Sequence, residues 1–311
     1  MDIFQEIKNR AVDYEPILKS CYQCMPNPDA RTMAIIIPVF KRTQFTKVIC
    51  ENFKNAIRHF YPMLQDPYKQ ISLTIVEHSP VAEHKELVGD WVNYVWIKNE
   101  GTFNKSLAYN VGGLLNRNAG FLLFHDLDTV VPKDFLARIG LNLERSFAIT
   151  PLIDCDENKP FALQCFTGRR LQLCNNWITN EIIEGRIPVD EISNHPGHIQ
   201  PAQPGAKGGS ILVHNKTFFN TTFCPEIFNG YGLEDAFFWD CIATQGHVSS
   251  CDAPPIELYH LAHDAHRVTK DIDWTFYNAF NSLAYNEKRR FIAFMASNVK
   301  KHLNETTHTN I

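Results

Sequence analysis

Two carboxylates, with a single residue between them, follow the apolar run of residues 121–124 after one histidine. An apolar run without polar interruption is typical of a strand buried on both faces of a parallel sheet. Ligands of open α/β sheets bind just outside the carboxyl ends of the strands. Asp126 and Asp128 would there offer oxygen ligands to a hard divalent cation such as Mn²⁺ or Mg²⁺, which neutralises a diphosphate. The alternative is that both residues only cap a turn before Pro132.

Two later stretches also carry groups capable of chemistry. His260-Leu261-Ala262-His263 is followed by His266, and three histidines in seven residues form a metal-binding cluster more often than chance. Glu234 and Asp235 stand where a helix should begin, after a glycine-containing turn. Acidic residues are favoured in a first helical turn, so capping is a serious alternative to a catalytic role for this pair.

The elements that must position these groups alternate along the chain. The patterns predict strands over residues 33–40, 71–76, 91–97, 147–153 and 256–259, and helices over residues 44–63, 106–116 and 134–145. Strand and helix in alternation indicate an α/β fold with a mostly parallel, doubly wound sheet and right-handed crossovers. No G-x-G-x-x-G or G-x-x-x-x-G-K-[ST] opens any of the helices, which disfavours a Rossmann dehydrogenase and a P-loop enzyme.

We expect three parts. Residues 1–30 form a helix and a Cys- and Pro-rich connector, residues 31–303 one domain, and residues 304–311 a polar tail. Within the domain, residues 154–204 are rich in proline and glycine, which predicts an irregular excursion that shapes an acceptor pocket. Trp177 lies in it, and we expect buried packing rather than sugar stacking for this side chain.

Composition excludes several classes. The net charge of −4 gives no reason to expect nucleic acid as a partner. The sequence contains no run of 18 apolar residues, so a membrane span is not expected. The charged N-terminus lacks a signal-peptide core, so a cytoplasmic location with reduced thiols is expected for the nine scattered cysteines. A truncated luminal catalytic domain stays open as an alternative.

The ordered set of motifs resembles the beta-1,4-galactosyltransferase family and its GT-A-fold relatives. The resemblance spans roughly residues 33–266 and rests mainly on the D-x-D and the glutamate-aspartate pair. The matching segments are Pro38-Val39-Phe40-Lys41-Arg42, Phe103-Asn104-Lys105, Tyr109-Asn110-Val111-Gly112, Asp126-Leu127-Asp128, Gly208-Gly209-Ser210, Gly230-Tyr231-Gly232-Leu233-Glu234-Asp235 and His260-Leu261-Ala262-His263.

This chain departs from the family pattern at several positions. Tyr231 stands where the family has tryptophan, and Lys105 replaces an arginine and its planar fork. His260 aligns with a methionine metal ligand and is the better ligand for a borderline cation. The segment between the D-x-D and the glycine pair is longer than in the family. This difference affects the identity of the acceptor more than the type of reaction.

The resemblance implies a GT-A glycosyltransferase that moves galactose or N-acetylgalactosamine from a UDP-sugar to a glycan or other hydroxyl acceptor, with inversion. Asp128, His260 and His263 would bind Mn²⁺ or Mg²⁺, and Asp235 would be the general base. Glu234 would hydrogen-bond acceptor or donor hydroxyls. The expected nucleotide-sugar-binding residues are Pro38, Val39, Phe40, Arg42, Glu77, Phe103, Lys105, Asp126, Gly208, Gly209 and Tyr231.

Three alternatives remain at this point. A retaining enzyme similar to polypeptide N-acetylgalactosaminyltransferases would keep the metal but would not need Asp235 as a base. A catalytically inactive sugar-nucleotide or glycan-binding module would keep the fold alone. A metal-dependent hydrolase would normally need more ligands than these motifs offer. Whether His125 or His266 joins the metal site is also left open by the sequence.

Overall fold

The computed structural model of the 311-residue chain describes most of the sequence. The described residues are 2–10, 12–25, 32–60, 70–149, 161–164, 170–201, 209–221, 228, 233–245, 247–250, 256–264 and 271–305.

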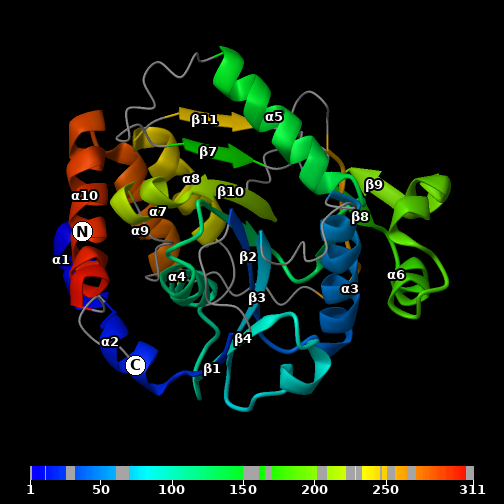
Figure 1. The fold of residues 1–311 in the computed structure, drawn as a ribbon. Coiled ribbons are helices and arrows are strands. Elements are labelled where there is room, and N and C mark those ends of the chain that lie inside the picture. Colours follow the sequence, from blue (N-terminus) through cyan, green and yellow to red (C-terminus); the bar gives the residue numbers. More distant parts are fainter. Residues whose placement is uncertain are drawn as a thin grey trace.

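A mixed eight-stranded sheet forms the centre of the molecule, with strand order β1-β4-β3-β2-β5-β10-β7-β11 (Figure 1). The four strands β4, β3, β2 and β5 are parallel, whereas β10 runs antiparallel to both of its neighbours. Their bounds are β1 Tyr22–Cys24, β2 Met33–Val39, β3 Ile71–Ser79, β4 Asn93–Lys98, β5 Phe121–His125, β7 Phe161–Gln164, β10 Ser210–His214 and β11 His247–Ser250. The predicted α/β class with a mostly parallel sheet is therefore confirmed.

Side-chain alternation along β2 explains why the sheet is covered on both faces. Ile35 and Ile37 pack into one buried apolar cluster, while Ala34 and Ile36 pack into another on the opposite face. Helices α3 (Thr43–Phe60) and α5 (Phe135–Ile149) lie on the first side, and α4 (Lys105–Leu115), α7 (Asn215–Thr221) and α8 (Glu234–Gln245) on the second (Figure 1).

Helix α4 lies unusually close to the sheet. A methyl group at Gly112 would come within 2.5 Å of the Ile36 side chain, and one at Gly113 within 2.5 Å of Phe218. Only glycine permits this approach at both positions. The close packing fixes the N-terminus of α4, which carries Lys105, beside the carboxyl ends of β2 and β5.

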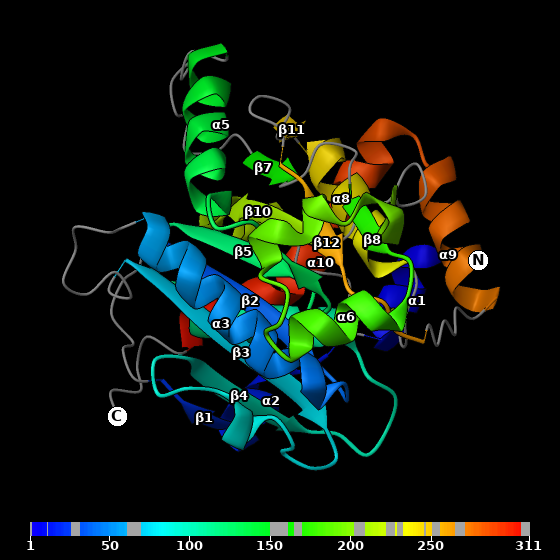
Figure 2. The same cartoon turned by 90° about the vertical axis from the view of Figure 1, so that its right-hand side faces the viewer.

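A second, four-stranded sheet has the order β6-β12-β8-β9, with bounds β6 Thr129–Val130, β12 Leu258–His260, β8 Arg170–Leu173 and β9 Ile199–Pro201. Helix α6 (Asn176–Ile183) and the short 3-10 helices η4 (Val189–Asn194) and η5 (Pro196–His198) belong to the same region, with α6 beside α3 (Figure 2). The stretch expected to be irregular thus has regular structure in its described part. Three of its described prolines and glycines lie at element ends: Pro188 precedes η4, Pro196 begins η5, and Gly185 follows α6 with φ of +72°.

Other expectations need correction near the chain's ends and in α5. The N-terminal segment forms two helices, α1 (Ile3–Arg10) and α2 (Tyr14–Ser20), instead of one. Residues 147–149, expected in a strand, continue helix α5, and residues 150–153 lie outside the described part. The C-terminal helices α9 (Asp271–Ser282) and α10 (Tyr285–Glu305) pack with α1 and α8 around a cluster of phenylalanines. Among the described residues, no helix combines the length and apolar character needed to cross a bilayer.

Candidate functional site

A short antiparallel pairing brings the D-x-D and the histidine segment together. Strand β6 follows Asp128 directly and pairs with β12, so that Thr129 stands opposite His260. The backbone N–H of Leu261 donates to the carbonyl of Asp128 at 2.8 Å and extends this pairing by one residue. Residues more than 130 positions apart therefore meet because two strands are in register, and not because of local sequence.

Three potential ligand atoms converge at this point. Asp128 Oδ2 lies 2.9 Å from His263 Nε2, and Asp128 Oδ1 lies 3.4 Å from His260 Nε2. The three side chains place one ligand atom each within 4.8 Å of one another. Burial alone would raise the pKa of Asp128, but the neighbouring His260 and His263 hold it well below its usual range. The carboxylate is thus charged and ready to bind a cation.

Two features of this cluster fit a divalent metal. Asp128 Oδ1 and His260 Nε2 are buried and, apart from their 3.4 Å contact with each other, have no hydrogen-bond partner among the described residues. Unpaired buried polar atoms are costly, which indicates that a further group completes the site. His263 Nδ1 lies 2.9 Å from the carbonyl of Asp264, so that with a metal at Nε2 the ring would donate its proton to this carbonyl. One carboxylate and two imidazoles suit Mn²⁺ or Zn²⁺ better than Ca²⁺.

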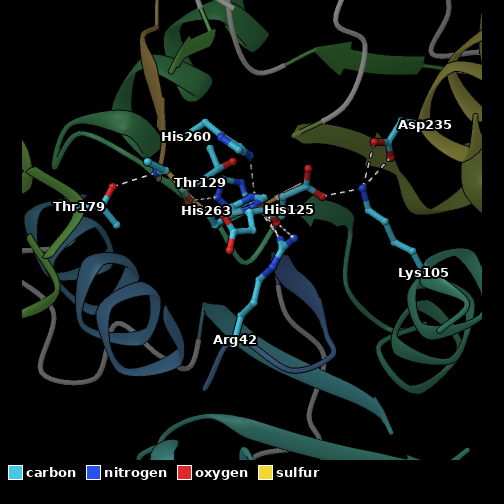
Figure 3. Close-up of polar contacts among 12 residues, drawn as sticks. Arg42, Lys105, His125, Thr129, Thr179, Asp235, His260 and His263 are labelled. Atoms are coloured by element: carbon cyan, nitrogen blue, oxygen red, sulfur yellow. Dashed lines mark hydrogen bonds and ion pairs between the residues drawn. The ribbon is translucent and has the colours of Figure 1, made fainter. Parts of the chain in front are cut away.

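The turn after β2 points a cation at this cluster. Lys41 and Arg42 both have positive φ, 55° and 57°, a left-handed conformation that costs about 1–3 kcal/mol for residues other than glycine. Arg42 Nη1 lies 2.7 Å from Asp128 Oδ2 and 3.2 Å from His263 Nε2. Figure 3 shows the Arg42 side chain directed toward His263. The strained turn thus places a guanidinium among the candidate metal ligands.

A second charged cluster surrounds Lys105, whose side chain is 5% exposed. Its Nζ lies 3.0 and 2.9 Å from the two carboxylate oxygens of Asp235 (Figure 3). It also lies 2.7 Å from Asp126 Oδ1 and 3.8 Å from Glu234. Tyr109 donates to Asp126 at 3.2 Å. Burial would lower the pKa of Lys105, but the charges of Asp126 and Asp235 outweigh it and raise the pKa well above the ordinary value.

Helix ends explain why these charges lie where they do. Asn104 caps α4 by accepting from the N–H of Leu107 at 2.8 Å, so Lys105 occupies the first helical position. A cation is unfavourable at a helix N-terminus, and the acidic residues around Lys105 compensate for it. Glu234 and Asp235 open α8, as predicted, and are favourable there whether or not they take part in chemistry.

Both clusters border one cavity of about 650 Å³. Phe40 and Phe103 line it as a stacked pair, with ring centroids 5.3 Å apart and planes 8° from parallel. The cavity is lined by Pro38, Phe40, Lys41, Arg42, Gln44, Thr102, Phe103, Lys105, Asp126, Leu127, Asp128, His263 and Asp264. Aromatic faces, three cations and the D-x-D in one cavity suit a ligand that has both a flat ring and an anionic group.

Several predicted binding residues do not face this cavity. Val39 is buried in the core that β2 shares with α3. Both oxygens of Glu77 are used within the protein: one accepts from Ser79 at 2.7 Å and the other from the backbone N–H of His84 at 3.1 Å. Glu77 therefore holds the segment after β3 instead of lining the site, a placement that strand position alone did not reveal.

The predicted glycine pair and aromatic are only partly described. Gly209 has φ of 106°, and its carbonyl accepts from the N–H of Asp126 at 3.0 Å, so it supports the D-x-D backbone. A side chain there would be strained by that φ. Gly208 and Tyr231 lie outside the described residues.

Of the two further histidines that could join the metal site, the structure describes His125. His125 is buried, with Nδ1 3.0 Å from Ser210 Oγ and Nε2 2.7 Å from the carbonyl of Thr129. Both of its nitrogens are thus engaged by the protein, which makes His125 a support for β6 and not a ligand. His266 lies outside the described residues.

Sequence reasoning missed the contribution of α6. Thr179, buried in α6, accepts through Oγ1 from the backbone N–H of Ala262 at 2.8 Å and so fixes the loop between the two ligand histidines. Trp177 in the same helix is 50% exposed, against the expectation of buried packing, and its ring lies 4.9 Å from that of His198. No motif marks Thr179, because its effect depends on a contact 83 residues away in sequence.

Comparisons with known proteins give distant likenesses only. No protein-family model matches the chain, and no curated protein matches it. A mutant of beta-1,4-galactosyltransferase 7 from Drosophila, crystallised with manganese, UDP-Gal and xylobiose, is 11% identical with a TM-score of 0.45, covering 79% of each chain. TarS from S. aureus is 12% identical with a TM-score of 0.46, covering 87% of this chain and 72% of that one.

Glucosyl-3-phosphoglycerate synthase from Mycobacterium tuberculosis, crystallised with Mn²⁺, UDP and phosphoglyceric acid, is 11% identical with a TM-score of 0.36. The match covers 86% of this chain and 78% of the synthase chain. At TM-scores below 0.5, fold and function have to be argued from the residues of this chain.

Proposed function

We propose that this chain is a metal-dependent glycosyltransferase that moves a hexose or N-acetylhexosamine from a UDP-sugar to a hydroxyl acceptor. Galactose and N-acetylgalactosamine are the favoured sugars. One observation carries the proposal: Asp128, His260 and His263 converge beside a cavity that Asp128 and His263 line together with stacked aromatic rings and three cations. A uridine ring and a diphosphate have the flat and anionic parts that such a cavity suits. The ordered motifs of the galactosyltransferase resemblance support the same conclusion.

Each part of the site has a proposed task in this reaction. Asp128, His260 and His263 would hold Mn²⁺ or Mg²⁺, which when bound stabilises the charge that gathers on a leaving diphosphate. Phe40 and Phe103 would contact the base, and the cations Lys41 and Arg42 the phosphates. These residues orient the donor so that one face of the sugar is open to the acceptor.

We further propose inversion, with Asp235 as the base that takes the acceptor proton. Lys105 donates to both oxygens of this carboxylate, at 3.0 and 2.9 Å, and so competes with the acceptor hydroxyl for them. The donor or acceptor would have to draw Lys105 away from Asp235 for full basicity. A retaining transferase with the same metal site is the second candidate, and it is favoured by the fact that both Asp235 oxygens are already engaged by Lys105.

The acceptor is proposed to bind near α6. Trp177 is exposed there beside the rings of His195 and His198, and exposed aromatic faces can stack on sugars. Thr179 connects the same helix to the histidine loop. A glycan or glycoconjugate therefore fits this side of the molecule.

Release of UDP from a panel of UDP-sugars, with Mn²⁺ and with EDTA, tests the activity. We expect Mn²⁺-dependent release and transfer with at least one donor. Asp235→Asn should lower kcat by about 10²–10⁴-fold because it cannot accept a proton. Glu234→Gln removes a neighbouring charge near Lys105 in the same helical turn and is the comparison: because Glu234 would only hydrogen-bond hydroxyls, this variant should lower kcat less than Asp235→Asn.

Product configuration, read by NMR, separates the two mechanisms. Inversion with an inactive Asp235→Asn variant fits the proposed base. Retention of configuration would instead support the second candidate. Absence of metal-dependent turnover with every UDP-sugar would contradict the glycosyltransferase proposal itself.

A further inference from the structure

Arg42 occupies the position that a bound cation would take. Its Nη1 lies 2.7 Å from Asp128 Oδ2 and 3.2 Å from His263 Nε2, and these are two of the atoms that form the candidate metal cluster. Its Nη2 lies 3.5 Å from the carbonyl of Asp264. The guanidinium is therefore surrounded by acceptors from both segments that carry ligands.

The direction of these contacts makes Arg42 a competitor of the metal. Arg42 Nη1 donates to Asp128 Oδ2 and lies within hydrogen-bond distance of His263 Nε2. Arg42 only donates and never accepts. Its Nη1 group thus occupies the space beside Asp128 Oδ2 and His263 Nε2, the two atoms that a metal would also use, and both cations cannot be there at once.

Arg42 also has a place to go when it leaves. It lines the same cavity as Lys41 and Lys105, where we place the diphosphate of the donor. A guanidinium binds phosphate oxygens through two parallel N–H groups, which makes a diphosphate a good replacement for one carboxylate. Its side chain is 28% exposed, so its movement is not blocked by burial on all sides.

We propose that Arg42 is an internal cation that closes the metal site until a nucleoside diphosphate enters the cavity. The diphosphate takes over the guanidinium, Asp128 and His263 become available, and metal and nucleotide bind together instead of one after the other. This rests on the proposed function, because it requires that the site bind a metal and a nucleotide. Mn²⁺ alone should then bind weakly to the protein, and UDP should strengthen its binding.

Titration of the full chain with Mn²⁺, followed by calorimetry and by the EPR signal of free Mn²⁺, tests the proposal without any turnover. Arg42→Met keeps the apolar stem and removes the competing charge. We expect it to bind Mn²⁺ alone about tenfold more tightly than the wild type, the size of one charge-assisted contact. UDP should strengthen Mn²⁺ binding much less in this variant than in the wild type.

Lys41→Met is the matched control. It loses the same charge one residue away and lines the same cavity, but the Lys41 ammonium lies over the Phe40 ring at 5.1 Å and makes no ion pair with Asp128. Equal tightening of Mn²⁺ binding in both variants would overturn the proposal, since net charge would then explain it. Unchanged or weaker Mn²⁺ binding in Arg42→Met would overturn it as well.

Two further variants separate a folding defect and a wrong metal site from a wrong role of Arg42. Arg42→Ala, with circular dichroism as the check on folding, replaces Arg42→Met if the latter does not fold. Asp128→Asn tests the metal site itself. Wild-type Mn²⁺ affinity in Asp128→Asn would contradict the proposed metal site, whereas lost affinity there with no gain in Arg42→Met contradicts only the role of Arg42.

Discussion

The two aspartates of the D-x-D differ in their surroundings although they stand two residues apart. Asp126 faces a buried lysine at 2.7 Å and the hydroxyl of Tyr109 at 3.2 Å. Asp128 faces two histidines and a partly exposed arginine, and its Oδ1 has no hydrogen-bond partner among the described residues. Asp126 is paired with a buried lysine, whereas Asp128 is paired with a partly exposed arginine, which we propose a ligand displaces. A D-x-D is therefore two sites with separate tasks and not one symmetric clamp.

The difference follows from what each aspartate connects. Lys105 joins the start of α4, the end of β5 and the start of α8, three segments that are distant in sequence. It is fully enclosed, so its charge must be matched inside the protein. Arg42 extends from a surface turn and contacts ligand atoms that another cation can claim. We infer that Lys105 holds its three segments together, whereas Arg42 serves the exchange of ligands.

Removal of each cation gives the largest expected difference between the two clusters. Lys105→Met leaves Asp126, Glu234 and Asp235 without their shared cation, and a broken buried pair costs about 3–5 kcal/mol of folding free energy. Arg42→Met should cost less than about 1 kcal/mol, because Arg42 is partly exposed to solvent. Urea unfolding followed by circular dichroism measures both. Lys105→Arg keeps the charge and is the control; equal losses in the two Met variants would refute the distinction.

The metal provides the next test of the comparison. Asp128→Asn should weaken Mn²⁺ binding by at least about a hundredfold, since even groups behind a metal ligand are worth 10–100-fold. Asp126→Asn has the same change in charge two residues away, but we expect it to lower Mn²⁺ affinity less than tenfold, because its carboxylate faces Lys105. Calorimetry in the presence of UDP measures both. Equal losses would show that the two aspartates share the metal after all.

Local patterns predicted the elements that carry the site. The apolar runs of β2 and β5, the D-x-D after β5, and the start of α8 at Glu234 follow from residue type and order alone. The histidine pair could likewise be read as a metal site because two imidazoles three residues apart are unusual.

The partners of these residues could not be predicted in the same way. The contact of Lys105 with Asp235 joins residues 130 positions apart, and that of Arg42 with Asp128 joins residues 86 apart. Such pairs depend on strand register and on which helix covers which face, and neither leaves a local signal. The antiparallel direction of β10 and the regular structure around α6 were missed for the same reason.

The smallest expected effect concerns the support beneath the Lys105 cluster. His78 is buried, and its Nδ1 accepts from the N–H of Asn104, the residue that caps α4. Burial lowers the pKa of His78 from 6.5 to about 4. Below pH 6.5 the unfolded chain gains a proton that the folded protein does not take up until about pH 4. This group therefore makes stability fall as the pH decreases through that window and has no effect above it.

His78→Asn isolates this effect. The Asn side-chain oxygen can replace Nδ1 as the acceptor for Asn104, but it does not titrate. From pH 6.5 to about pH 5 the wild type should lose about 2 kcal/mol more of unfolding free energy than the variant, at 1.36 kcal/mol per pH unit. Urea unfolding at several pH values measures the two slopes. Some slope should remain, because burial also lowers the pKa of His84. Identical slopes would mean that His78 takes up its proton in the folded protein, and that the cap of α4 does not require it to be neutral.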